Sequence, residues 1–357
     1  MKWYVIAATA FIAAGIISCA SLGGSSQGDS NAEGYNSALY QKQGEAFFEQ
    51  KEYDQAITAF TKMIKLDPND TVAYGWRGDA YLAQEKYDRA IEDYAKAITL
   101  DPKNAGLYNK RGDAYLAQAE YDRAVVDYTK AIRFDPNYAV AYYNRGGAYY
   151  EKKDYRRAIV DYTKAIRLDP NYAVAYIDRG RAYSAREDYD QAIADYTEVI
   201  EFDPNYAAAY IDRGTAYSEK ADYDRAITDY TEAIRLDPYS AFTYIDRGKA
   251  YSEKAEYDRA IADYTEAIRF DPNNAVTYID RGRAYSAKRD YDRAIADYTE
   301  AIRLFPYVAD AYNSRGGAYI AKRDYDRAIA DFTKAISIDP LSGVYKENLE
   351  KAKKRGM

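Results

Sequence analysis

The sequence predicts an all-α protein built from stacked helical hairpins, and three observations carry that prediction. The 357-residue chain has nine prolines, and consecutive prolines are always 34 residues apart. Between them, apolar residues recur at spacings of three and four, which is typical of amphipathic helices. Histidine is absent and cysteine occurs once, which excludes histidine-based active sites, Cys-rich zinc sites and an internal disulfide. The prolines are Pro68, Pro102, Pro136, Pro170, Pro204, Pro238, Pro272, Pro306 and Pro340.

The first segment, residues 1–18, has the pattern of a secretory signal peptide. A basic second residue precedes an apolar run over residues 3–17, which is shorter than the about 20 residues of a membrane-spanning helix. The segment ends Ile16-Ile17-Ser18-Cys19, which resembles the lipobox of bacterial lipoproteins. The resemblance implies that Cys19 receives lipid and anchors the mature protein to a membrane. The alternative is an ordinary signal peptide, cut after Ser18 or Ala20, in which the cysteine is incidental.

The next segment is predicted to connect this anchor to the folded part. Residues 20–36 are rich in Gly and Ser and contain no apolar run, so a flexible tether is expected. About 17 residues of such a tether reach roughly 20–25 Å. We therefore expect residues 19–36 to be a lipidated terminus and tether.

Residues 37–342 divide into nine repeats when each proline is taken as position 32 of its repeat. In residues 207–240 the apolar positions predict two helices, with Asp222 as a candidate N-cap of the second. Pro238 ends that second helix because proline cannot continue it. The nine repeats are 37–70, 71–104, 105–138, 139–172, 173–206, 207–240, 241–274, 275–308 and 309–342.

The repeat resembles the tetratricopeptide repeat, a 34-residue helix–turn–helix unit. The resemblance implies an α-solenoid of nine such repeats that forms a right-handed superhelix. Residues 343–357 continue a helical pattern with a charged face, which predicts a C-terminal capping helix and tail. Gly214 and Ala226 are expected where the two helices of a hairpin cross, because small residues let backbones approach. The matching residues in the sixth repeat are Tyr210, Gly214, Tyr217, Ala226, Tyr230 and Pro238.

Two recurring features are interpreted as structural. Most of the 43 tyrosines fall at positions 4, 11, 17 and 24 of the repeat, so they are expected to pack rather than bind a ligand. Position 7 is Arg and position 23 is Asp in repeats two to nine, and repeat one has neither. Joint presence and joint loss predict a ladder of internal ion pairs, for example between Arg213 and Asp229.

The resemblance also implies a concave groove lined by the first helix of each repeat, through positions 2, 5, 9 and 12, with position 6 at its edge. An isoleucine at position 5 of repeats five to eight is expected to form an exposed aliphatic stripe; the alternative is that these residues contact the adjacent repeat. Around Gly147, repeat four is expected to form a wider spot with aromatic walls. The candidate groove residues are Tyr143, Tyr150, Ile177, Arg181, Ile211, Thr215, Phe242, Ile245, Lys249, Ile279 and Arg283.

The sequence thus predicts a lipid-anchored scaffold that binds a protein or peptide in the bacterial cell envelope, at the periplasmic side of the outer membrane or the cell surface. No catalytic residue, metal or cofactor is expected. The net charge of −7 gives no general attraction to nucleic acid. The family's carboxylate clamp is absent, since position 5 is never Lys and position 9 never Asn. A solute-binding accessory lipoprotein that works with an envelope transporter is the alternative; a carboxylate-pair hydrolase is disfavoured because no insertion builds a pocket.

Overall fold

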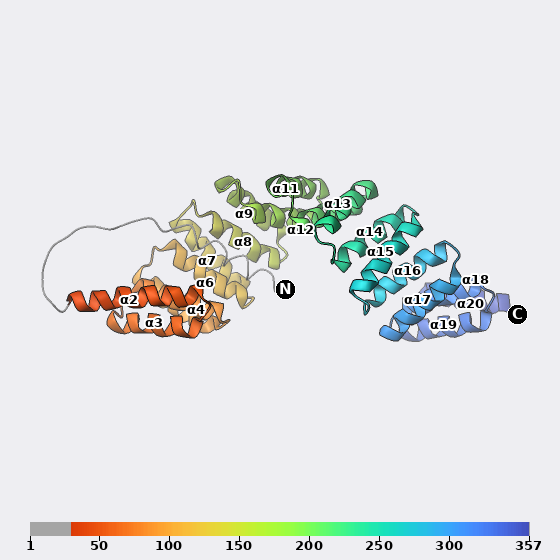
Figure 1. The fold of residues 1–357 in the computed structure, drawn as a ribbon, viewed down its shortest axis with the longest axis horizontal. Helices are drawn as coiled ribbons and strands as arrows, with labels where there is room; N and C mark the ends of the chain where they lie inside the picture. Colours follow the sequence, from red (N-terminus) through yellow and green to blue (C-terminus); the bar gives the residue numbers. More distant parts are fainter. Residues whose placement is uncertain (1–29, 357) are drawn as a thin grey trace. The chain divides into compact units, whose positions relative to one another are not determined.

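The computed structural model describes residues 30–356, and they form consecutive α-helices joined by short turns (Figure 1). The described residues contain no strand, and the expected all-α repeat solenoid is confirmed. The predicted signal peptide and Cys19 lie outside the described residues. The helices are α2 (Ser30–Glu49), α3 (Tyr53–Leu66), α4 (Thr71–Ala83), α5 (Tyr87–Leu100), α6 (Ala105–Ala117), α7 (Tyr121–Phe134), α8 (Ala139–Glu151), α9 (Tyr155–Leu168), α10 (Ala173–Ser184), α11 (Tyr189–Phe202), α12 (Ala207–Glu219), α13 (Tyr223–Leu236), α14 (Ala241–Glu253), α15 (Tyr257–Phe270), α16 (Ala275–Ala287), α17 (Tyr291–Leu304), α18 (Ala309–Ala321), α19 (Tyr325–Ile338) and α20 (Gly343–Gly356).

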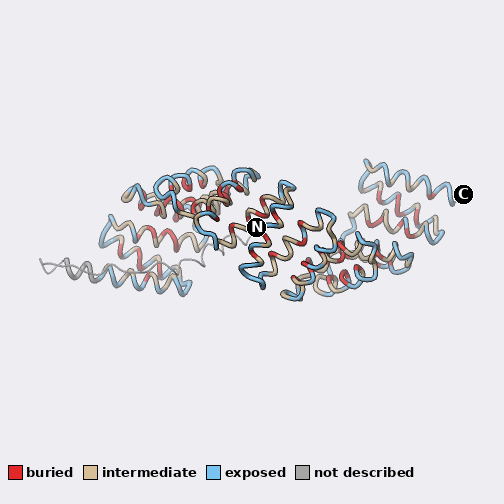
Figure 2. Tube along the Cα trace, turned by 90° about the horizontal axis from the view of Figure 1, so that it is seen from above, coloured by how far each residue is buried: buried red, intermediate tan, exposed pale blue. Residues whose placement is uncertain are grey.

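The chain divides into two compact units, which we call unit 1 (Met1–Ala182) and unit 2 (Tyr183–Met357). Within each unit, the first helix of a repeat packs on its second helix, and that second helix packs on the first helix of the next repeat. Buried residues lie between helices, and the turns are exposed (Figure 2). Among residues 30–356, no helix is long and apolar enough to cross a bilayer.

A glycine and an aromatic ring fix the crossing of the two helices within a repeat. A Cβ added at Gly214 would lie 2.9 Å from the Tyr230 ring, and one at Gly44 would lie 2.5 Å from the Phe60 ring. The rings themselves are almost fully buried; Tyr230 is 2 % exposed. The packing role of the position-24 tyrosines is confirmed. The atoms nearest a Cβ at Gly214 belong to Tyr230 and Asp229 and not to Ala226, which was the expected contact. Larger residues would force the hairpin apart, because protein interiors are close-packed.

The turn between the two helices has the same backbone conformation in every repeat. In the second repeat, Glu85 adopts a φ of 59°, and the Lys86 N–H donates to the Tyr81 carbonyl at 2.9 Å. This left-handed residue and its hydrogen bond close the helix end in the manner of a Schellman motif. No repeat uses glycine there, although left-handed backbone favours it. The residues with positive φ are Lys51, Glu85, Ala119, Lys153, Glu187, Ala221, Ala255, Arg289 and Arg323.

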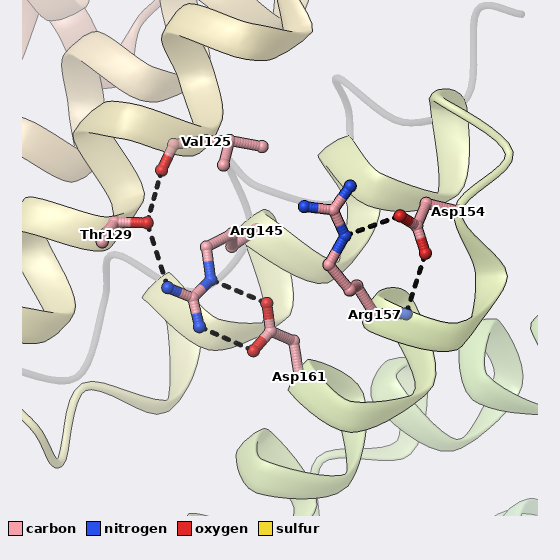
Figure 3. A network of polar contacts seen from close by, with 6 residues as sticks. All are labelled: Val125, Thr129, Arg145, Asp154, Arg157 and Asp161. Atoms are coloured by element: carbon pink, nitrogen blue, oxygen red, sulfur yellow. Dashed lines mark hydrogen bonds and ion pairs between the residues drawn. The ribbon is translucent and has the colours of Figure 1, made fainter.

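The predicted arginine–aspartate ladder is present, and it also links neighbouring repeats. The Arg145 guanidinium donates from Nε and Nη2 to both carboxylate oxygens of Asp161, at 2.7 and 2.8 Å (Figure 3). Its Nη1 donates to the Thr129 hydroxyl of the preceding repeat at 3.0 Å. Arg145 therefore fixes its own hairpin and the register of that hairpin on the preceding one. Arg111 pairs with Asp127 but has no such threonine, because residue 95 is Ala. The pairs are Arg77–Asp93, Arg111–Asp127, Arg145–Asp161, Arg213–Asp229, Arg247–Asp263, Arg281–Asp297 and Arg315–Asp331.

The N-terminal end of the array differs from the sequence prediction, and the C-terminal end has the expected helix. Helix α2 begins at Ser30, so the last residues of the predicted tether, 30–36, are helical. At the other end, α20 packs on α19 and buries Ala352 in a cluster with Phe332.

Candidate functional site

The candidate groove residues lie on one side of the first helices, which we call the first-helix face (positions 2, 5, 6, 9 and 12 of the repeats). The expectation of an exposed isoleucine stripe on this face is wrong. Ile177, Ile245 and Ile279 are only 4 %, 7 % and 4 % exposed, and Ile211 is half-buried. These side chains therefore contribute to the core rather than to a contact surface.

The reason for their burial is the stacking of repeats. Ile245 belongs to a buried cluster that combines Tyr264 of its own second helix with Ala284 of the next first helix. Ile279 is buried in the same way with Tyr298 and with Ala311 of the following repeat. The alternative interpretation, in which the isoleucines contact the adjacent repeat, is confirmed. Position 5 thus points between hairpins.

The remaining candidate residues are accessible to different degrees. Thr215, Phe242, Lys249 and Arg283 are exposed, with Phe242 at 72 %, whereas Tyr143, Tyr150 and Arg181 are half-buried. In unit 2 the cations of this face have acidic partners on the same helix: Arg283 lies 3.1 Å from Asp280 and Lys249 lies 3.6 Å from Asp246. The face of unit 2 is therefore a set of locally neutralised charges.

The first-helix face of unit 1 holds a different arrangement, centred on Asp113. One of its carboxylate oxygens accepts hydrogen bonds from the Tyr128 hydroxyl at 2.8 Å and the Asn144 amide at 2.9 Å. The other accepts from the Asn109 amide at 3.2 Å, and the Asn144 amide also donates to the Asn109 carbonyl oxygen at 3.2 Å. We call these four residues the Asp113 cluster. It joins α6, α7 and α8, so two successive repeats build it.

The carboxylate of Asp113 is held by neutral donors. Among the described residues, no Lys or Arg nitrogen forms an ion pair with it. Burial raises the pKa of Asp113 to about 7, and the nearby Asp79 carboxylate adds to the rise, while the hydrogen bonds from Tyr128 and Asn144 and the charge of Lys110 oppose it. A carboxylate that is desolvated without an opposite charge resists ionisation. Asp113 is thus an uncompensated acidic group on an accessible face.

The carboxylates on either side of Asp113 do have cations. Asp79 accepts from the Tyr94 hydroxyl at 2.7 Å and pairs with Lys110 at 2.6 Å. Asp178 accepts from the Tyr143 hydroxyl at 2.7 Å and lies 3.4 Å from an Arg181 nitrogen. On the first-helix face of unit 1, Asp79 and Asp178 therefore have a cation beside them, whereas Asp113 has none.

Tyrosines surround this part of the face. The Tyr143 ring packs at 5.0 Å from the Tyr172 ring and 5.7 Å from the Tyr162 ring. Burial raises the pKa of Tyr138 to about 12 and also raises the pKa of Tyr172; the Asp113 charge is the next cause for both. Both phenols are therefore close enough to sense Asp113. We call Tyr138, Tyr143 and Tyr172 the tyrosine wall.

Tyr138 and Tyr172 stand where other repeats place a helix cap. Asp70 caps α4 by accepting from the Ala73 N–H at 2.9 Å, and Asn104 and Asn274 cap α6 and α16 in the same way. At the N-cap of α8, Tyr138 makes no such bond. Losing a cap costs about 1 kcal/mol. In unit 2 the N-cap residues Tyr206, Ser240 and Val308 make no side-chain cap bond either, so a missing cap is not particular to this face.

The predicted wider spot at Gly147 is confirmed. A Cβ added there would meet only the Tyr162 hydroxyl, at 3.9 Å, whereas one added at the neighbouring Gly146 would lie 2.8 Å from the Tyr162 ring. Gly146 is required by packing and Gly147 is not. Space is therefore available on α8 beside Tyr143 and Asn144.

Sequence reasoning found Tyr143 and Gly147 but missed Asp113, Asn109, Asn144, Tyr138 and Tyr172. One signal was available for the two tyrosines, because they occupy a position that holds Asp or Asn in three other repeats. The Asp113 cluster had no comparable signal, since Asp113 and Asn144 are 31 residues apart.

Elsewhere, the described residues contain two shallow cavities and no cluster of side chains that could hold a metal ion. Residues 30–356 contain no group of acidic or Cys side chains arranged to hold a metal ion. A shallow cavity of ≈ 340 Å³ lies at the turn between α12 and α13, lined by Lys220, Asp222 and Lys254 among others. Another of ≈ 350 Å³ lies beside α6 and α7, lined by Arg111 and Tyr115 among others. Both are open to solvent.

The fold and this face define a helical-repeat scaffold of the class that binds other proteins. Tetratricopeptide repeat models match residues 44–153, 139–172, 168–238, 248–288 and 279–342. The chain belongs to the tetratricopeptide repeat proteins. Members of this family generally bind protein or peptide partners and are not catalytic.

Solved structures agree with the fold. A tetratricopeptide repeat protein from Parabacteroides merdae is 20 % identical with a TM-score of 0.53, over 70 % of this chain and 99 % of that one. The C-terminal part of a repeat protein from Cytophaga hutchinsonii is 20 % identical with a TM-score of 0.58, over 67 % and 98 %. YrrB, described as having an unusual peptide-binding site, is 24 % identical with a TM-score of 0.47, over 54 % and 97 %. A comparison with curated proteins finds no match.

Proposed function

We propose that this protein is a lipid-anchored scaffold of the bacterial cell envelope, and that the first-helix face of unit 1 binds an extended segment of another protein. The observation that carries the binding site is the Asp113 cluster with its tyrosine wall. Tyr128 belongs to the core, whereas Asp113, Asn144 and the tyrosine wall are half-buried, and Tyr138 makes no cap bond at α8.

The chemistry of this face suits a peptide. Asn144 is half-buried, and its side-chain amide can both donate to and accept from a peptide backbone. Asn109 is only 4 % exposed, and its carbonyl oxygen accepts from Asn144 beneath this surface. Tyrosine rings give a large contact area with few rotatable bonds, and they are enriched in protein interfaces. The space at Gly147 gives a backbone room to approach α8.

A capture experiment tests the site. The double variant Tyr143→Ser with Tyr172→Ser removes two rings of the tyrosine wall, and we expect it to lose an envelope partner that the unchanged protein retains after cross-linking. Phe242→Ser in unit 2 is the matched control, because Phe242 is an exposed aromatic residue on the same face. Circular dichroism establishes that each variant is folded. Loss of the partner with Phe242→Ser alone would place the site in unit 2 and contradict the proposal.

The anchor is tested separately. Cys19→Ala removes the thiol that would carry the lipid, and we expect the protein to move from the detergent phase to the aqueous phase in a detergent-partition experiment. Ser18→Ala is the control, because it keeps the cysteine and a small residue before it. If Cys19→Ala partitions as the unchanged protein does, the lipid anchor is refuted, while the proposed binding site is not affected by this result.

A further inference from the structure

We propose that the segment bound by unit 1 presents a lysine or arginine side chain, and that its cation pairs with Asp113 beside Tyr138 and Tyr172. This inference rests on the proposed function and adds the chemistry of the partner. It follows from charge complementarity on the first-helix face, the surroundings of Asp113 and the loss of a helix cap.

The first step is the charge of the face. Asp79 and Asp178 are neutralised within unit 1 by Lys110 and Arg181, and in unit 2 Asp246 and Asp280 lie beside Lys249 and Arg283. Among the described residues, Asp113 has neutral hydrogen-bond partners only. A desolvated carboxylate without a cation is costly, and one charge brought by a partner removes that cost. The carboxylate therefore favours a cationic occupant over a neutral or acidic one.

The second step is the aromatic surroundings. Asn144, which donates to Asp113, directly follows Tyr143 on α8, and the Tyr143 ring lies 5.0 Å from the Tyr172 ring. The Asp113 charge also contributes to the raised pKa of Tyr138 and Tyr172. Ammonium and guanidinium groups are attracted to the faces of aromatic rings, and the attraction grows where water is excluded. The aliphatic part of a lysine or arginine side chain also packs well on tyrosine. A metal cation would not use these rings in this way, and an acidic side chain would be repelled by Asp113.

The third step concerns the stability that these residues cost the free protein. Tyr138 replaces a capping residue, and Asp113 keeps a charge without a cation; each lowers the stability of the free protein. A basic side chain bound at Asp113 supplies the missing cation, although it does not restore the cap. In unit 2 Asn274 caps α16, but Tyr206 at the N-cap of α12 makes no cap bond. The lack of a cation at Asp113 therefore distinguishes unit 1 from Asp246 and Asp280 of unit 2, which have cations beside them.

The test is a selection of random twelve-residue peptides on the full-length protein, followed by sequencing of the bound peptides. We expect Lys and Arg to be enriched at one fixed peptide position on the unchanged protein, and Asp113→Asn to lose that enrichment. Asp246→Asn in unit 2 is the matched control, since it makes the same change of net charge and should retain the enrichment. Replacing the selected lysine of one peptide by norleucine should weaken binding roughly tenfold or more.

The other outcomes separate this inference from the proposed function. If peptides are selected but Lys and Arg are not enriched, or if the enrichment survives Asp113→Asn, the basic anchor is wrong while peptide binding stands. If Asp246→Asn loses the enrichment equally, the preference comes from net charge and the Asp113 assignment is wrong. If no peptide is selected, both proposals fail. Circular dichroism and thermal melting of each variant establish folding.

Discussion

Units 1 and 2 share one frame but carry different groups on their first-helix faces. The arginine–aspartate ladder and the glycine–aromatic contact recur in both, as Arg111 with Asp127 in unit 1 and Arg213 with Asp229 in unit 2 show. On the first-helix face, Asp246 and Asp280 of unit 2 have cations beside them, whereas Asp113 of unit 1 has only neutral donors.

This difference separates stability from binding. Side chains that join one hairpin to the next vary little, because every repeat must bury the same surface on its neighbour. Positions 5, 6 and 9 take part in this burial only in some repeats. The isoleucines Ile245 and Ile279 at position 5 of unit 2 are buried in the core. Asn109 and Tyr143 occupy the same position in unit 1 and form hydrogen bonds with Asp113 and Asp178. The residues that join the hairpins are therefore the same in both units, while the accessible residues of the first-helix face differ.

The largest expected effect concerns the shared frame. Asp229→Ala leaves the Arg213 guanidinium partly buried without its carboxylate, and should lower the free energy of unfolding by ~3–5 kcal/mol. Asp127→Ala in unit 1 should cost a similar amount. Urea denaturation measures both, and a double-mutant cycle with Arg213→Ala should show strong coupling. Independent effects of the two substitutions would contradict the pair.

The next prediction concerns the pH dependence of stability, which should differ between Asp113 in unit 1 and Asp246 in unit 2. Since Asp113 has a raised pKa of about 7 in the folded protein, it contributes stability below about pH 4 that is lost as the pH rises through 7. Relative to Asp113→Asn, the unchanged protein should therefore become less stable from pH 4 to pH 8, by about 1.4 kcal/mol for each unit of pKa shift.

Asp246→Asn is the comparison for this measurement. Burial raises the pKa of Asp246 too, but Lys249 opposes the rise, so the pH dependence should be weaker. Urea denaturation at a series of pH values gives the slopes. Equal slopes for the two variants would show that Asp113 is not exceptional.

A smaller effect distinguishes two adjacent glycines. Gly146→Ala places a methyl group against the Tyr162 ring and should destabilise the protein by roughly 1–3 kcal/mol. Gly147→Ala has space and should stabilise it by about 1 kcal/mol, because alanine favours helix more than glycine. Gly316→Ala and Gly317→Ala in unit 2 should behave in the same two ways. Thermal melting measures all four, and a loss of stability in Gly147→Ala would refute the open space.

The smallest effect should be the same in both units. Ala119→Gly in unit 1 and Ala221→Gly in unit 2 relieve a left-handed backbone conformation, and each should stabilise the protein by about 1 kcal/mol or less, because greater freedom of glycine in the unfolded chain offsets part of the gain. Denaturant midpoints measure the change. Opposite signs in the two units would mean that the turns are not equivalent.

The sequence by itself determined the local structure of this protein. The spacing of the prolines and apolar residues sets where each helix begins and ends, and the co-occurrence of Arg213 and Asp229 types predicts their pairing. These features are encoded within 34 residues, so periodicity reveals them.

Only the tertiary structure decided which side chains remain accessible. Ile245 and Ile279 lie on a face that the helical pattern alone leaves open, and the next hairpin covers them. Asp113 and Asn144 meet because two repeats stack, and the raised pKa of Asp113 follows from that burial. Burial and charge compensation depend on what packs against a residue from outside its own helix, and a repeat pattern carries no information on which neighbours supply a cation.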